Sequence, residues 1–212
     1  TQQGYSPFST WTRGLAWAIL GFAEQLEFLT TLDEDEFTLI GDKSDIISEL
    51  LAAAIATADF YCEHSPTDGI PYWDTGAPGL AQLGEWRNRP AEPFNDHEPI
   101  DSSAAAIAAQ GLIRMAQYLD KSDPAASNKY LQAGLTTTKT LLGPTYLSCD
   151  AKHEGLLLHT VYHRPNGWDY VPEGRTIPCG ESCMWGDYHL QELGLLVQRL
   201  ATEKKYPTFF GG

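Results

Sequence analysis

The sequence is poor in positive charge and contains no long apolar segment. Its 212 residues include 14 lysines and arginines against 28 aspartates and glutamates, which gives a formal net charge of −14. Nucleic acids and anionic membranes are bound by basic surfaces, so this balance argues against both as partners. No apolar run approaches the roughly 18 residues that a membrane-spanning helix needs. An anionic small substrate stays compatible with the charge, because one local arginine can outweigh a distant acidic surface.

Several motifs of common sites are absent as well. Four cysteines are too few for a scaffold built on disulfides, although Cys179 and Cys183 are close enough in sequence to pair. A second cysteine pair that would complete a zinc site is missing. His159 and His163 lack the glutamate of a zinc-protease motif, so we expect no metal. The cellular compartment stays open, with secretion slightly favoured by the cysteines.

Hydrophobic periodicity predicts an all-α protein. Apolar residues recur at spacings of three and four, which is typical of helices that bury one face. The expected helices span residues 9–31, 44–62, 101–119, 125–142 and 181–201, with Ser44 and Asp101 as N-caps. The acidic run 33–36 is expected to be a solvated turn. Short connections alternate with the long irregular stretches 64–100 and 145–180. This rhythm suits a toroid of helical hairpins whose long loops converge on one binding face.

The first expected helix carries an unusual set of side chains near its start. Arg13 and Trp17 are four residues apart and therefore share a helix face, with Trp11 just before them. An indole ring can stack on a sugar, and a guanidinium can bind a carboxylate through two hydrogen bonds. Ordinary aromatic packing around the apolar stem of an arginine is the alternative, and composition alone favours it.

Two aspartates lie in aromatic motifs. Asp74 in "PYWDTGAPG" is a candidate general acid or, equally, part of a turn anchored by its tryptophan. Asp187 in "WGDY" falls near the start of the last expected helix, where the helix dipole favours a structural carboxylate.

Five segments, in order along the chain, resemble one enzyme family. They are "GYSPFSTWTRGLAWAILGF", "DGIPYWDTGAPG", "PIDSSAAAIAAQGLIRMA", "GLLLHTVYHRPNG" and "ESCMWGDYHLQEL". Together they are similar to motifs of the unsaturated glucuronyl hydrolases, glycoside hydrolase family 88. The unsaturated rhamnogalacturonyl hydrolases of family 105 are the near neighbours. The resemblance implies an (α/α)6 barrel, of which residues 1–212 supply about the C-terminal half as part of a single domain.

The resemblance also implies a reaction. These enzymes hydrate the C4=C5 double bond of the 4,5-unsaturated uronic acid that polysaccharide lyases leave at the non-reducing end of an oligosaccharide. An aspartate protonates the vinyl ether and activates the water that adds at C5. No metal or organic cofactor is needed, and the carboxylate spacing of ordinary glycosidases does not apply.

Matching the motifs residue by residue implies a substrate-binding set. Gln3 and Arg13 suit the uronate carboxylate and hydroxyls, Trp11 and Trp17 suit the walls around the ring, and Ser182 matches a serine that contacts substrate. The catalytic aspartates of the family lie upstream of the first motif, so we expect the acid/base residue before Thr1. The N-terminal half of the same enzyme is then an expected partner.

Two other functions remain open from the sequence. One is a non-catalytic carbohydrate-binding remnant of the same fold. The other is a different helical-toroid glycosidase with an internal catalytic acid, Asp74 or Asp101.

Overall fold

The computed structural model describes residues 2–205 and 208, and its architecture is helical. Its five α-helices are α1 (Thr12–Leu29), α2 (Lys43–Glu63), α3 (Ser102–Leu119), α4 (Pro124–Leu141) and α5 (Met184–Ala201). Four short 3-10 helices lie in the connections: η1 (Glu34–Phe37), η2 (Pro78–Leu83), η3 (Trp86–Asn88) and η4 (Arg164–Asn166). Within the described residues, β structure is limited to isolated bridges, so the all-α prediction is confirmed. No helix in the described part of the chain has the length and apolar character to cross a membrane.

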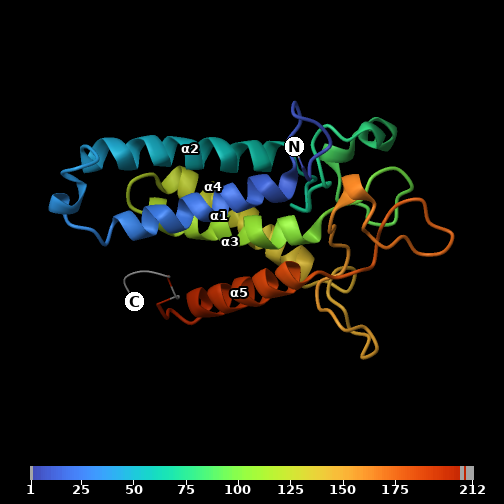
Figure 1. Cartoon of the computed structure of the whole chain (residues 1–212). Coiled ribbons are helices and arrows are strands. Elements are labelled where there is room, and N and C mark those ends of the chain that lie inside the picture. Colours follow the sequence, from blue (N-terminus) through green and yellow to red (C-terminus); the bar gives the residue numbers. More distant parts are fainter. Residues whose placement is uncertain (1, 206–207, 209–212) are drawn as a thin grey trace.

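Helix α3 forms the centre of the fold. It packs against α1, α4 and α5, while α2 packs on α1 (Figure 1). All but two of its 18 residues are buried. Its many small residues allow this, because they let neighbouring backbones approach closely. At Gly111 a Cβ atom would lie only 2.7 Å from the backbone nitrogen of Leu20 in α1.

The helices form consecutive hairpins with a common direction. Helices α1, α3 and α5 run parallel, and α2 and α4 return beside them (Figure 1). The two long loops, residues 64–101 and 142–183, gather at the end where α1, α3 and α5 begin (Figure 1). This arrangement agrees with the expected convergence of the long connections, and it places the starts of three parallel helices under one set of loops.

Two apolar clusters hold these elements together. One lies between α1, α2 and α3 and includes Ile19, Leu26 and Leu112. The other joins α3, α5 and the loops and includes Trp73 and Leu193. Each large aliphatic side chain buried in this way contributes about 1.5–3 kcal/mol before entropy is counted.

The sequence prediction misplaced some helix starts. Ser44 is not the N-cap of α2, because the Asp42 carboxylate takes that role and accepts the backbone N–H groups of Ser44 and Asp45 at 2.8 and 3.3 Å. Helix α5 begins at Met184 rather than at residue 181, since Cys183 has extended backbone. The N-cap role of Asp101 and the exposed turn at the acidic run are confirmed.

Candidate functional site

A buried ion pair joins the starts of α1 and α3. The Nη1 atom of Arg13 lies 3.0 Å from Oδ2 of Asp101, and both side chains are almost fully buried. The other oxygen of Asp101 accepts hydrogen bonds from the Ser103 backbone at 3.1 Å and hydroxyl at 2.5 Å. Asp101 therefore both caps α3 and neutralises Arg13. Such a pair is stable only because its remaining polar atoms are also satisfied.

The other terminal N–H groups of Arg13 hold the loop that follows residue 158. Nη1 also donates to the carbonyl of Val161, and Nη2 donates to the carbonyl of Tyr162 at 2.9 Å. Nη2 further donates to Oε1 of Gln3 at 3.1 Å. This last bond orients the Gln3 amide, whose NH2 group has no acceptor among the described residues. Gln3 is thereby left able to donate to an incoming ligand oxygen.

Two indole rings contact the Arg13 guanidinium. Its Cζ atom lies 5.0 Å from the ring centroid of Trp11 and 4.9 Å from that of Trp185. Cation–π contacts of a desolvated arginine are worth about 2 kcal/mol each. The stack continues from Trp185 to Tyr162, at 5.3 Å, and then to Trp168, at 5.8 Å. Tyr162 and Trp168 are 47% and 61% exposed, so the stack presents open aromatic surface at its outer end.

Trp17 offers a second exposed ring one helical turn further along α1. It is 40% exposed, and its ring meets that of His189 in α5 edge-on at 4.9 Å. The pairs Arg13–Trp185 and Trp17–His189 are thus successive cross-contacts between two parallel helices. The sequence prediction that Arg13 and Trp17 share a helix face agrees with this geometry.

Ser182 occupies a separate cavity just before α5. The cavity measures about 440 Å³ and is also lined by Lys152, His153 and Asp187, among others. The hydroxyl oxygen of Ser182 is buried and has no hydrogen-bond partner among the described residues. None of the other four candidate binding residues lines this cavity. The structure therefore groups Gln3, Trp11, Arg13 and Trp17 and leaves Ser182 beside them in a pocket of its own.

The two candidate internal acids both have structural partners. The side chain of Asp74 is fully buried and accepts the backbone N–H groups of Tyr5 at 2.8 Å and Gly76 at 2.9 Å. Asp101 is fully buried in its ion pair. A general acid must reach the atom that it protonates. This geometry gives no support to an internal catalytic acid at either position.

The remaining candidates from the sequence are also part of the scaffold. Asp187 accepts the backbone N–H groups of Leu156 and Leu157 at 2.9 and 2.8 Å, which fits its expected structural role. His163 accepts the Asn166 N–H at 3.3 Å. All four cysteines are free thiols. In the described part of the chain, no group of three or more His, Cys, Asp or Glu side chains is arranged to hold a metal ion.

His159 fastens distant parts of the second long loop, residues 142–183, to one another. Its Nδ1 accepts the Gly180 N–H at 3.0 Å, so its Nε2 carries the proton and donates to the carbonyl of Thr145 at 3.1 Å. Burial lowers the pKa of His159 to about 4, which keeps the ring neutral near pH 7. A neutral ring is also what the bond from Gly180 requires, because an imidazolium has no acceptor.

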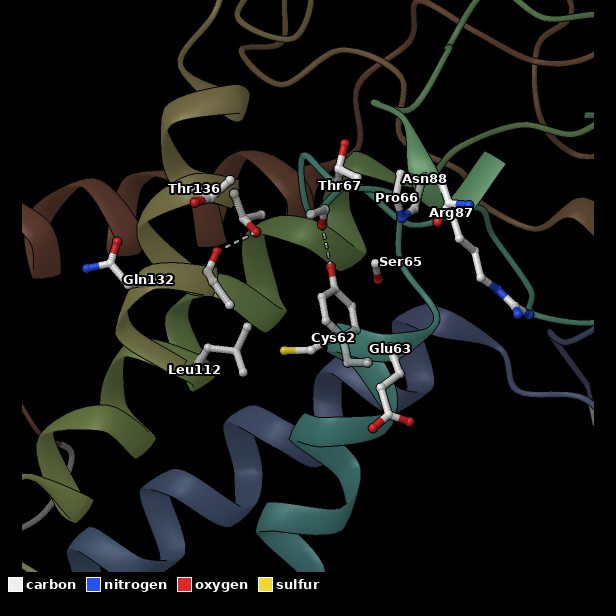
Figure 2. A pocket seen from close by; sticks show the side chains of 14 residues that line it. Cys62, Glu63, Ser65, Pro66, Thr67, Arg87, Asn88, Leu112, Gln132 and Thr136 are labelled. Carbon is white, nitrogen blue, oxygen red and sulfur yellow. Dashed lines mark hydrogen bonds between the residues drawn. The ribbon is translucent and has the colours of Figure 1, made fainter. Parts of the chain in front are cut away.

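Another cavity, of about 460 Å³, lies on the far side of α3 between the end of α2 and α4 (Figure 2). The buried hydroxyl of Ser65 is in this cavity. Figure 2 shows the side chains of Gln132 and Arg87 at opposite sides of it, pointing away from one another. A binding site needs a few polar groups that converge on its ligand. The cluster around Arg13 meets this requirement better.

Several aromatic residues of the cluster were not predicted from the sequence. They are Tyr162, Trp168, Trp185, Tyr188 and His189. The spacing of Trp185 and His189, four apart on an expected helix, was a signal that could have placed them on one face. Tyr162 and Trp168 lie in an irregular loop, where no periodicity indicates which way a side chain points.

Comparison with known proteins gives a consistent result. The chain is 33% identical over 202 residues to an unsaturated glucuronyl hydrolase of Bacillus sp. (strain GL1), a match that covers 95% of this chain and 43% of the relative. It is 30% identical over 193 residues to an unsaturated chondroitin disaccharide hydrolase of Streptococcus pyogenes, covering 91% and 38%. No protein-family model matches the chain.

Solved structures agree with the sequence matches. The crystal structure of the Bacillus sp. GL1 unsaturated glucuronyl hydrolase, described as responsible for the degradation of glycosaminoglycan, superposes with a TM-score of 0.65 at 32% identity. That match covers 95% of this chain and 43% of the other. An unsaturated glucuronyl hydrolase variant of Streptococcus agalactiae, in complex with dGlcA-GalNAc6S, gives a TM-score of 0.60 at 26% identity over 91% of this chain and 40% of the other.

In sequence and in fold, the chain is therefore similar to the unsaturated glucuronyl hydrolases, as its five motifs predicted. Its helices correspond to part of their (α/α)6 barrel. The chain spans about two fifths of the length of these relatives. The comparisons leave the roles of individual side chains open.

Proposed function

We propose that this chain forms one wall of the substrate site of a hydrolase that acts on unsaturated uronyl oligosaccharides. The observation that carries the proposal is the grouping of Gln3, Arg13, Trp11 and Trp17 at the N-terminal end of α1, at the end of the fold where the parallel helices α3 and α5 also begin. The reaction is hydration of the C4=C5 double bond of the 4,5-unsaturated uronic acid at the non-reducing end.

The electrostatics of this end suit a uronate. Three helices begin here, and the partial positive charge of a helix N-terminus favours a carboxylate. Asp101 cancels the full charge of Arg13, so the ligand carboxylate meets helix dipoles and the oriented Gln3 amide rather than a free cation. We assign Arg13 to holding that amide and the loop carbonyls in place. Direct contact with substrate would require the ligand to replace Gln3 on Nη2.

The exposed rings supply the complementary surface. A pyranose presents an apolar face of C–H groups that can stack on an indole, and Trp17 has an accessible ring at the same end of α1. One face of the Trp11 ring is covered by Arg13. Trp11 therefore contributes to the wall of the substrate site only through the part of its side chain that stays exposed. Ser182 would contact a more distant part of the oligosaccharide through the separate cavity that it lines, once its buried hydroxyl is uncovered.

The chemistry needs an acid, and the described carboxylates at the cluster, Asp101 and Asp169, are both engaged as hydrogen-bond acceptors. In the proposed reaction an aspartate gives a proton to C4, water adds to C5, and the proton lost by that water returns to the aspartate. The hemiketal at C5 then opens to a ketone, which leaves a hemiacetal at C1. This hemiacetal collapses to an aldehyde and releases the neighbouring sugar as an alcohol. We place this aspartate in an N-terminal half that completes a single barrel domain with residues 1–212. The relatives, which this chain covers by only 38–43%, support this arrangement.

The test uses the purified chain and an unsaturated chondroitin disaccharide. We expect saturable quenching of tryptophan fluorescence, and no loss of the ultraviolet absorbance of the C4=C5 bond while the chain is alone. Addition of the N-terminal half of the Bacillus relative would supply the acid, and any loss of absorbance should then depend on both parts.

Two results would overturn parts of this proposal. Absence of saturable binding at millimolar disaccharide would remove the binding site. Hydration by the chain alone, abolished by Asp74→Asn or Asp101→Asn in a folded variant, would place the acid inside residues 1–212.

A further inference from the structure

A chain of hydrogen bonds across α3 and α5 ends at His189. Nδ1 of His189 lies 2.9 Å from Oε1 of Gln110, and Nε2 of Gln110 donates to Oε2 of Glu192 at 2.9 Å. The other oxygen of Glu192 accepts the Tyr188 hydroxyl at 2.6 Å. Gln110 and His189 are buried, whereas Tyr188 is 50% exposed.

This relay determines the tautomer of His189. A carboxylate can only accept hydrogen bonds, so the amide of Gln110 must turn its NH2 group toward Glu192. Its carbonyl oxygen then faces His189 and requires a proton on Nδ1. Nε2 is left with a lone pair, provided that the ring is neutral. Burial lowers the pKa of His189, in keeping with a neutral ring near pH 7.

Nε2 of His189 is accessible to solvent next to the proposed sugar site. Nε2 has no hydrogen-bond partner among the described residues and is not sealed from solvent. The His189 ring contacts the rings of Trp17 and Tyr188, whose centroids are each 4.9 Å away and which are both partly exposed. A ring with an acceptor in a fixed tautomer therefore adjoins the ring that is proposed to carry the sugar.

We propose that Nε2 of His189 accepts a hydrogen bond from a hydroxyl of the sugar stacked on Trp17, and that Gln110 and Glu192 hold it in that tautomer. His189 is then a specificity-determining residue that recognises a sugar hydroxyl by accepting its hydrogen bond. Gln110 and Glu192 are positioning residues. This inference rests on the proposed function, because it needs a sugar at Trp17.

The groups around the relay act on the charge of His189 in opposite directions. Helix α3 presents Gln110, which accepts from Nδ1, and Arg114, which pairs with Glu24 and Glu27 of α1. Helix α5 presents Glu192, whose Oε2 lies 3.7 Å from Nδ1 and favours protonation of the ring. Glu192 is itself occupied by Gln110 and Tyr188, while desolvation acts in the opposite direction on His189 and has the larger effect.

The test is a titration of the ¹⁵N-labelled chain with the unsaturated chondroitin disaccharide, followed through the histidine side-chain nitrogens by NMR. In the free chain we expect His189 with a proton on Nδ1 and none on Nε2. On binding, the Nε2 resonance should move and the Nδ1 resonance should stay. H189F keeps the ring contact with Trp17 but removes the acceptor, and should weaken binding about 2- to 12-fold, the equivalent of one neutral hydrogen bond.

E192Q and H97F complete the experiment. E192Q lets Gln110 reverse its amide, so His189 should show a mixture of tautomers, a result that does not depend on how well H189F folds. His97 is exposed and its ring makes no hydrogen bond that the structure records, so H97F should bind the disaccharide as the unmodified chain does.

The outcomes separate this inference from the proposed function. If the unmodified chain does not bind the disaccharide, the proposed function fails at this site and the inference fails with it. If the chain binds, but Nε2 of His189 is protonated in the free state or does not respond to the ligand, the inference alone is wrong. Equal affinity of H189F and the unmodified chain would contradict it as well.

Discussion

Two buried arginines, Arg13 and Arg114, lie at opposite ends of the interface (the seam) between α1 and α3, and their partners differ. Arg13 meets one fully buried aspartate, two loop carbonyls and two indole rings. Arg114 meets Glu24 and Glu27 at 3.8 and 2.8 Å, and these side chains are 22% and 12% exposed. At the first end the charges are sealed under loops. At the second end, two carboxylates share one guanidinium and retain access to water.

This difference explains why the loop-covered end is the better candidate for a site. A sealed ion pair fixes its neighbours, so the Gln3 amide and the loop after residue 158 are oriented before any ligand arrives. At the Arg114 end, burial and the neighbouring Glu27 and Glu192 raise the pKa of Glu24 even though Arg114 lowers it. An excess of carboxylates at that end would repel an anionic sugar.

Breaking the sealed pair should have the largest effect on stability. Asp101→Asn keeps an N-cap side chain but leaves the Arg13 charge buried without its counterion. We expect a loss of about 3–5 kcal/mol in the free energy of unfolding, measured by urea denaturation. Asp123→Asn is the matched control, because Asp123 caps α4 at an exposed position by accepting the Ala126 N–H. A loss no larger than that of the control would show that the ion pair does not fasten this end.

Acid should loosen the loop-covered end next. The folded chain holds the pKa of His159 at about 4, below its ordinary value of 6.5, so the unfolded chain takes up a proton first. The contribution of neutral His159 to the free energy of unfolding is complete above pH 6.5. It falls as the pH drops toward 4 and is absent below that. The difference corresponds to about 3 kcal/mol.

The variant His159→Asn removes this titration and should flatten the fall in stability between pH 6.5 and 4. Asparagine tolerates the positive φ of 65° at this position. Unfolding of both proteins in urea across that pH range measures the effect. Parallel pH profiles would mean that another group causes the acid sensitivity.

Removing the cation at the other end should cost less. Arg114→Met leaves Glu24 and Glu27 without their partner, but both have partial access to water. We expect a loss of about 1–3 kcal/mol at pH 7, below that of Asp101→Asn. The loss should shrink on acidification, because without Arg114 the pKa of Glu24 rises further and protonation relieves the repulsion. A deficit that is independent of pH would contradict this account of the Arg114 end.

The smallest effect on stability should come from the exposed ring. Trp17→Phe removes a side chain that is 40% exposed, so the free energy of unfolding should change by less than about 1 kcal/mol. Its affinity for the disaccharide should nevertheless fall by about 2- to 12-fold through the loss of stacking area. Trp185→Phe is the contrasting variant. It removes the N–H that donates to Ser103 at 3.2 Å and should cost more stability. The reverse ranking of the two variants in stability would contradict the burial argument.

The sequence predicted those features of the structure that depend on residues close together in the chain. The alanine-rich periodicity of α3 and the cap at Asp101 were readable because a helix and its cap depend on neighbours within a few residues. Asp42 shows the limit of this approach: the sequence prediction placed the cap at Ser44, but the cap is the residue with extended backbone before the helix, and that residue is Asp42.

The partners of Arg13 were not readable, because they come from distant segments. Asp101, Val161 and Trp185 are separated from Arg13 by 88 residues or more, and two of the bonds go to backbone carbonyls, which leave no trace in side-chain patterns. The tautomer of His189 depends in the same way on Gln110, which is 79 residues away.

The most direct test of the central claim is a map of where the disaccharide binds. The backbone amide resonances of the ¹⁵N-labelled chain would be followed during titration with the unsaturated chondroitin disaccharide. We predict saturable shifts at residues 3–17 and 182–189, around the starts of α1 and α5, and at residues 160–169 of the loop between α4 and α5. Shifts confined to the cavity around Ser65, or to the Arg114 end of the seam, would contradict the claim.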